Sequence, residues 1–243
     1  MCLLSDTVVD AQLFLSRLEA AAAEFGLEMN PTKTEVMMWY AEGTLTSSSG
    51  QQIKKSDDFK YLGSWISSTA KDLKVRKGQA WAALFKLDKI WHSKLSRKLK
   101  IQFFKATVES VLLYGSESWT LTKTLEYRLD GCYTRLLRHA LNIKWQQKVK
   151  NIDLYKDLPK ISEVVRKRRL KFAGHCYRAK NECISDVLLW EPKHGRRGVG
   201  RPAITYLDCL KEDTGLNVAE MASAMKDRVL WRTICQHRQR STR

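Results

Sequence analysis

The chain has no long apolar run and no closely paired cysteines, and each absence narrows the class of protein it can be. Charged residues interrupt every helical stretch within a few positions, so we expect no transmembrane helix. The six cysteines contain no Cys-x-x-Cys pair, a scatter typical of free thiols in an intracellular protein. No apolar leader stands at the N-terminus, so we expect a nuclear or cytoplasmic location and no contact with a membrane.

Acidic residues are scarce beside basic ones. Forty-three Lys and Arg oppose 26 Asp and Glu, which gives a net charge of +17. Such an excess suits a polyanionic partner, because phosphate backbones attract Lys and Arg and release counterions on binding. RNA or DNA, contacted mainly through phosphates, is the expected partner. The alternative is a protein whose basic faces are simply solvated.

The first third of the chain combines one helix with short strands. Apolar residues recur at helical spacing between Asp6 and Phe25, and Gly26 is a typical residue for ending such a helix. Three short runs follow, at 27–29, 35–40 and 59–66, separated by turn-forming residues. We expect them to form small antiparallel hairpins that pack on the helix.

The remainder has helical periodicity. Helices are predicted at 72–92, 96–114, 124–140 and 161–177, and from about Thr205 and Asn217 onward. An irregular loop is expected after the fourth of these, through Pro192 to Pro202. The predicted fold class is therefore α+β and predominantly α-helical.

Two segments in order carry a resemblance to a known family. Gly26-Leu-Glu-Met-Asn-Pro-Thr-Lys-Thr-Glu35 and Phe59-Lys-Tyr-Leu-Gly-Ser64 resemble consecutive blocks of the reverse transcriptases of non-LTR (LINE-type) retrotransposons. The segment Tyr114–Trp119 and the run from Arg168 to Pro202 are similar to regions that follow the polymerase core of these elements. The resemblance implies a palm remnant at 1–66, a helical thumb-like region at 67–150 and a basic nucleic-acid-binding region at 151–243.

The resemblance also implies a parent activity, RNA-directed DNA polymerisation with Mg²⁺ held by catalytic aspartates. It aligns Met1 with the position just after the family's Asp-Asp pair. We therefore expect a truncated, catalytically inactive chain that needs no cofactor and keeps residual RNA or DNA binding. The alternative is a non-catalytic helical scaffold or interaction protein derived from the element.

Two positions match functional elements of the family. Lys33 matches a lysine near the phosphates of the incoming nucleotide, and without the rest of that site it is expected to be vestigial. Tyr61, Leu62 and Gly63 match the hairpin that grips the primer terminus, where glycine permits close approach of a strand. An ordinary tight hairpin with Tyr61 in the core is an equal alternative.

Two basic segments are the expected nucleic-acid contacts. In the predicted helix the candidates are Arg166, Lys167, Arg168, Arg169 and Lys171. In the glycine-rich loop they are Arg196, Arg197 and Arg201, around a Gly-Arg-Pro core of the kind that enters narrow minor grooves. A solvated helix face, a nuclear-import signal and a solvated loop are the alternatives.

One group of residues has zinc-ligand chemistry without zinc-ligand spacing. These residues are His175, Cys176, Cys183 and His194. Adjacent residues on a helix point in different directions, and the paired knuckle of zinc sites is missing. No metal site is expected, and His175 is predicted to be a buried packing residue.

Overall fold

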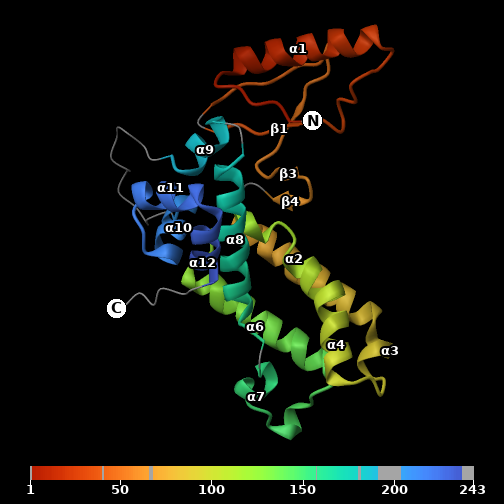
Figure 1. Cartoon of the computed structure of the whole chain (residues 1–243). Helices are drawn as coiled ribbons and strands as arrows, with labels where there is room; N and C mark the ends of the chain where they lie inside the picture. Colours follow the sequence, from red (N-terminus) through yellow and green to blue (C-terminus); the bar gives the residue numbers. More distant parts are fainter. Residues whose placement is uncertain are drawn as a thin grey trace. The chain divides into compact units, whose positions relative to one another are not determined.

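The structure, a computed structural model, describes residues 2–39, 41–65, 68–156, 158–179, 182–190 and 204–236. It divides into two compact units, Met1–Ser68 and Thr69–Arg243. Both units are drawn in Figure 1. Among the described residues the structure is mostly helical, with two small two-stranded sheets, in agreement with the predicted fold class.

The first unit is built on helix α1, Val8–Glu24, as the apolar spacing predicted. Thr7 caps its N-terminus: the hydroxyl accepts from the backbone N–H of Asp10 and donates to the Asp10 carboxylate, at 3.0 and 2.7 Å. Gly26 follows the helix with φ of 69°, a conformation that favours glycine. Leu15 on this helix packs with Leu45 and Ile53 to form a small core.

The strands of the first unit differ in part from the prediction. Strands β3 (Lys60–Tyr61) and β4 (Ser64–Trp65) form the expected antiparallel hairpin. Strand β1 (Glu35–Val36) instead pairs in parallel with β2 (Lys54–Lys55), and 27–29 forms no strand. The prediction of hairpins throughout was wrong there, because Lys54–Lys55 is exposed and has no apolar alternation that would indicate a strand.

The second unit contains the remaining helices. Their bounds are α2 Thr69–Lys86, α3 Asp88–Trp91, α4 Arg97–Phe104, α5 Ser110–Leu112, α6 Lys123–Ala140, α7 Asn151–Tyr155, α8 Ile161–Tyr177, α9 Glu182–Leu188, α10 Tyr206–Thr214, α11 Val218–Lys226 and α12 Arg228–Gln236. A π-helical turn η1 covers Lys105–Glu109, and 3₁₀ turns η2 and η3 cover Ser116–Ser118 and Trp145–Gln147.

Two predicted long helices are interrupted. The helix predicted at 72–92 breaks at Leu87, and the one at 96–114 passes through the π-helical turn. Phe104, Val108 and Leu112 form the buried stripe of the second, whereas Phe103 is exposed. A π turn holds one residue more than an α turn, so it moves the buried stripe by one position.

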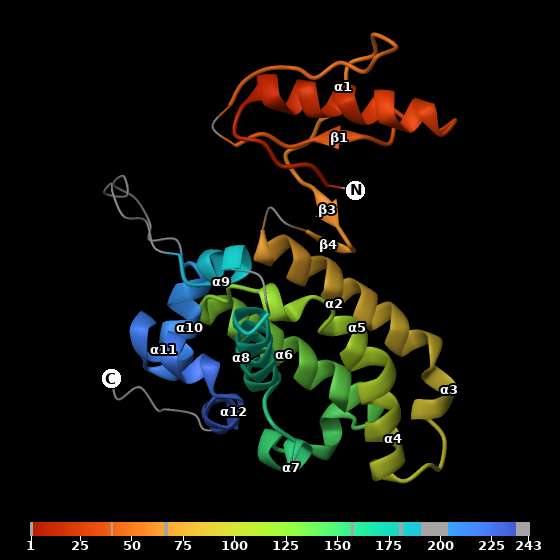
Figure 2. The ribbon, with the colours of Figure 1, turned by 45° about the horizontal axis from the view of Figure 1, so that its top comes forward.

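Helix α8 joins the two hydrophobic clusters of the second unit. Ile161 and Val165 near its start belong to the larger cluster, formed mainly by α2, α4, α5 and α6. Leu170 and Ala173 belong to the smaller cluster with α10, α11 and α12. Figure 2 shows α8 between α6 on one side and the C-terminal helices on the other. The larger cluster runs past residue 150 without a break.

Candidate nucleic-acid interface

Helix α8 holds five of the predicted contact residues, and the structure divides them between two faces. The helix spans Ile161–Tyr177, as predicted. Arg166 and Arg169 are buried, Arg168 is half-buried, and Lys167 and Lys171 are exposed. Arg169 falls on the stripe of Val165 and Ala173, at the four-residue spacing of one helix face. The arginines therefore point mostly into the protein and the lysines away from it.

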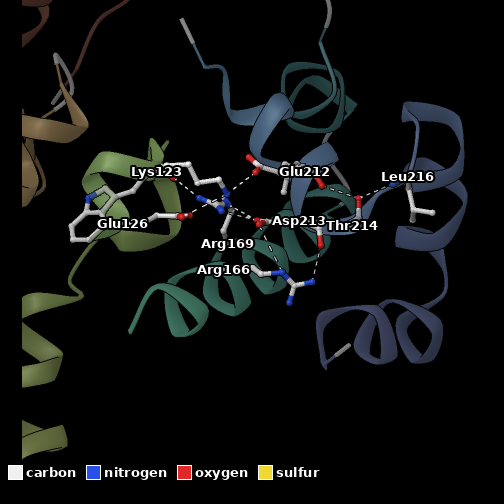
Figure 3. Close-up of polar contacts among 10 residues, drawn as sticks. Lys123, Glu126, Arg166, Arg169, Glu212, Asp213, Thr214 and Leu216 are labelled. Carbon is white, nitrogen blue, oxygen red and sulfur yellow. Dashed lines mark hydrogen bonds and ion pairs between the residues drawn. The ribbon is translucent and has the colours of Figure 1, made fainter. Parts of the chain in front are cut away.

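Arg169 sits at the centre of a buried polar cluster (Figure 3). Its Nε and Nη2 donate to Oδ2 of Asp213 on α10 at 2.9 and 2.7 Å, and Nη1 donates to the carbonyl of Trp119 at 2.8 Å. Burial favours loss of the guanidinium charge, but the Asp213 carboxylate outweighs it, so the pKa of Arg169 lies above its ordinary value. The side chain ties α8 to α10 and to the segment after η2.

Two further arginines of α8 also bind protein acceptors. Nη2 of Arg166 donates to the carbonyl of Asp213 at 2.7 Å, so the same residue of α10 receives both arginines. Nη1 of Arg168 donates to the carbonyl of Leu113 at 3.0 Å, just beyond the end of α5. Sequence reasoning assigned these arginines to phosphate contact, but in the structure their guanidinium groups are directed to carbonyl and carboxylate oxygens.

The indole of Trp119 extends this cluster toward α2. Its Nε1–H donates to Oδ2 of buried Asp72 at 2.8 Å. Because the Trp119 carbonyl accepts from Arg169, a chain of hydrogen bonds runs from α2 through Trp119 and α8 to Asp213 on α10. Every group in this chain has a partner, the condition under which buried polar groups specify a fold. Its residues hold the helices together.

A more exposed ion pair lies at the edge of the cluster. Nζ of Lys123 at the start of α6 is 2.6 Å from Oε1 of Glu212, and 3.7 Å from Glu126. Figure 3 shows these side chains beside Arg169 and Asp213. Burial raises the pKa of Glu126 above its ordinary value, although Lys123 acts in the opposite direction. The pairs at this edge face solvent and contribute little to stability.

Lys167 and Lys171 form the outward face of α8. They lie four residues apart, which places them one above the other on the helix. Phe172 beside them is exposed as well. A second exposed pair at the same spacing, Arg228 and Arg232, lies on α12, which packs against α8. The sequence analysis did not identify that pair. The spacing of four residues between the two arginines of an amphipathic helix could have indicated it.

Helix α12 packs against one face of α8 and so determines which of its side chains are buried. Trp231 crosses Gly174 and donates from Nε1 to the carbonyl of Leu170 at 2.8 Å. Arg178, just after the end of α8, donates to the carbonyl of Met225 on α11 at 2.7 Å. The Trp231 indole therefore lies between α12 and α8, and α11 is bonded to the end of α8.

The predicted loop contacts lie outside the described residues. Arg196, Arg197 and Arg201 belong to the segment 191–203, and so does His194. Their assignment to phosphate contact remains a prediction.

The predicted packing role of His175 was wrong. The residue is exposed on α8, because it follows the buried Gly174 by one position and is turned away from the core. Cys176 beside it is half-buried, and the side chain of Cys183 is outside the described part. No group of three or more His, Cys, Asp or Glu in the described ranges is arranged to hold a metal ion.

Lys33 lies in an exposed turn organised by Asn30. The Asn30 side-chain oxygen accepts from the backbone N–H of Thr32 and of Lys33, at 3.1 and 3.2 Å. The Asn-Pro-Thr-Lys-Thr sequence thus forms an Asx turn that leaves the Lys33 side chain exposed. Its role near a nucleotide remains a prediction.

The hairpin that matches the primer grip closes with a two-residue turn. Leu62 and Gly63 both have positive φ, 46° and 89°, as a two-residue turn of type I′ requires. Tyr61 and Leu62 are exposed, so Tyr61 does not fill a core as the ordinary-hairpin alternative supposed. The hairpin presents an aromatic and an aliphatic side chain to solvent.

No described helix combines the length and the apolar character that crossing a membrane demands. No known family model matches the chain, and no solved structure matches it. The chain is 28% identical over 247 residues to a transposon-derived protein of Caenorhabditis elegans, a match that covers 91% of this chain and 87% of that protein. This similarity along almost the whole length fits a transposable-element origin of the chain.

Proposed function

We propose that the chain derives from the reverse transcriptase of a non-LTR retrotransposon and binds RNA or DNA through phosphate contacts. The two ordered sequence blocks support the family, and the transposon-derived relative fits it. The net charge of +17 supports a polyanionic partner.

The observation that carries the binding proposal is the division of charge on α8. Arg166, Arg168 and Arg169 are directed to protein acceptors, whereas Lys167 and Lys171 remain exposed. Lysine is a compact, mobile charge that suits phosphate contact without base reading. The binding is therefore expected to be independent of sequence.

A salt titration of the full chain tests this mechanism. A protein that contacts about six phosphates loses on the order of a thousandfold in affinity between 50 and 200 mM salt. We expect a loss of that order for mixed-sequence RNA and DNA. An affinity that does not change with salt would contradict an electrostatic contact.

We also propose that this part of the element contributes binding and not polymerisation. Lys33 stands in an exposed turn, and the described residues hold no group of carboxylates arranged for a metal ion. Primer extension by the purified chain, tested with Mg²⁺ on an RNA template, is expected to be absent. Template-dependent extension would contradict this proposal.

The second candidate is a helical scaffold or interaction protein. The buried Arg169–Asp213 pair favours a scaffold, because Arg169 already holds α8 against α10. Replacement of Arg168 or Arg169 by alanine would not discriminate the two functions, since it would disturb packing. Lys167 and Lys171 are the informative positions: unchanged nucleic-acid affinity after their replacement would favour the scaffold.

A further inference from the structure

The segment between α6 and α7 of the helical unit carries an exposed tryptophan. Trp145, the first residue of η3, is 81% exposed. Trp91, Trp119 and Trp231 of the same unit are fully buried. An indole has one of the largest apolar surfaces of any side chain, so leaving it in water forgoes a large stabilisation. The Trp145 indole therefore contributes little to the packing of this unit.

The turn that carries Trp145 is anchored on both sides. Ile143 before it and Val149 after it pack against the larger hydrophobic cluster. Nη2 of Arg138 on α6 donates to the Val149 carbonyl at 2.7 Å and to Oδ1 of Asn151 at 2.9 Å. The turn that carries the indole is therefore fixed by contacts on both sides. A fixed turn loses less conformational entropy when it binds a partner.

The residues next to Trp145 in the sequence include several lysines and no acidic residue. Lys144, Lys148 and Lys150 are all exposed, and no Asp or Glu occurs between Leu141 and Ile152. The centres of protein–protein interfaces are depleted in lysine. A flat aromatic surface flanked by positive charges is the combination that binds unpaired bases and their phosphates.

We propose that Trp145 is a stacking platform for an unpaired base of single-stranded nucleic acid, with Lys144, Lys148 and Lys150 contacting the flanking phosphates. Every base has an aromatic face, so the contact needs no particular sequence. In a duplex those faces are covered by neighbouring base pairs, so the site prefers single strands. The inference rests on the proposed nucleic-acid function for its class of partner, but the site is separate from Lys167 and Lys171.

Fluorescence anisotropy of the full chain with three labelled probes tests the proposal. The probes are a short oligouridylate, an oligothymidylate and a duplex of the same length. Trp145→Ala is expected to weaken binding of at least one single strand by roughly 5- to 150-fold and to leave duplex binding nearly unchanged. Comparison of the first two probes shows whether RNA or DNA is the strand bound. Trp145→Phe is expected to restore most of the affinity, because phenylalanine still stacks.

Trp190 provides a matched control, since it is 65% exposed and lies just after α9. Trp190→Ala is expected to leave all three affinities unchanged. Unchanged single-strand affinity in Trp145→Ala would overturn the proposal, as would an equal loss on duplex and single strands. Loss of self-association without loss of binding, seen by sedimentation, would overturn it in favour of a protein contact. If the wild-type chain binds none of the probes, the proposed function itself fails.

Discussion

The indole of Trp231 lies directly against Gly174, at the point where α12 crosses α8. A Cβ atom at position 174 would lie 2.2 Å from Nε1 and 2.3 Å from Cδ1 of Trp231. Such distances are far shorter than any van der Waals contact. The ring is buried and its Nε1–H is bonded to the Leu170 carbonyl, so it has little freedom to move. Glycine at 174 is thus required by the close approach of two helices.

Replacing Gly174 by alanine is therefore expected to destabilise the second unit. Overpacking of a filled core costs about 1–3 kcal/mol in the free energy of unfolding. Urea denaturation of Gly174→Ala against wild type measures this loss. Gly131→Ala in α6 is the control, because nothing lies within 4 Å of a Cβ there. That variant is expected to gain up to ~1 kcal/mol from helix propensity. Equal stability of the two variants would contradict the contact.

Two ion pairs of nearly equal length are expected to contribute very differently to the free energy of unfolding. Arg169–Asp213 and Lys123–Glu212 are 2.7 and 2.6 Å long, but their side chains are 4% and 12% exposed in the first pair and 66% and 54% in the second. Asp213→Ala leaves a buried charge unpaired and should cost about 3–5 kcal/mol. Glu212→Ala should cost about 0–1 kcal/mol, because solvent screens the pair.

Chemical denaturation of both variants measures this difference. The double replacement Arg169→Met with Asp213→Leu provides a further check, because it removes both buried charges. It should be more stable than Asp213→Ala alone. Similar losses in Asp213→Ala and Glu212→Ala would show that the pair between α8 and α10 is not buried as described.

The cysteines are expected to differ in reactivity. Burial is the main reason that the pKa of the Cys209 thiol rises to about 11. Only the thiolate reacts with alkylating reagents, and at pH 8 roughly one Cys209 thiol in a thousand is then ionised. Cys2, by contrast, is exposed. Peptide-resolved alkylation at pH 8 should modify Cys2 rapidly and Cys209 only after denaturation. Fast labelling of Cys209 in the native chain would contradict its burial.

The sequence predicted some elements closely because their ends carry local signals. Thr205 and Asn217 cap α10 and α11 where helices were expected to begin, and both form capping boxes with an acid three residues later. Helix α8 has the predicted bounds, since its apolar stripe starts at Ile161 and the pattern stops after Tyr177. The parallel pairing of β1 with β2 could not be predicted, because its register depends on contacts across a long loop.

The sequence predicted the helix that carries the basic run, but not which of its side chains are buried. Charge alone suggests that a run of basic residues forms a single surface. A helix turns by about 100° at each residue, so consecutive side chains are distributed around its axis. Arg169 occupies the position between Val165 and Ala173 on the buried stripe, which the spacing could have revealed. Its partner Asp213 is 44 residues away, so the pair itself could not be inferred.

The most direct test of the account is the nucleic-acid affinity of a charge-reversal pair. Lys167→Glu with Lys171→Glu changes the exposed face of α8, and Lys94→Glu with Lys98→Glu makes the same charge change at exposed lysines four residues apart near α4. Both double variants should keep the wild-type free energy of unfolding. The first should lose much more affinity for RNA or DNA at low salt than the second and should show a shallower salt dependence. Equal affinities for the two double variants would contradict the assignment of binding to the lysine face of α8.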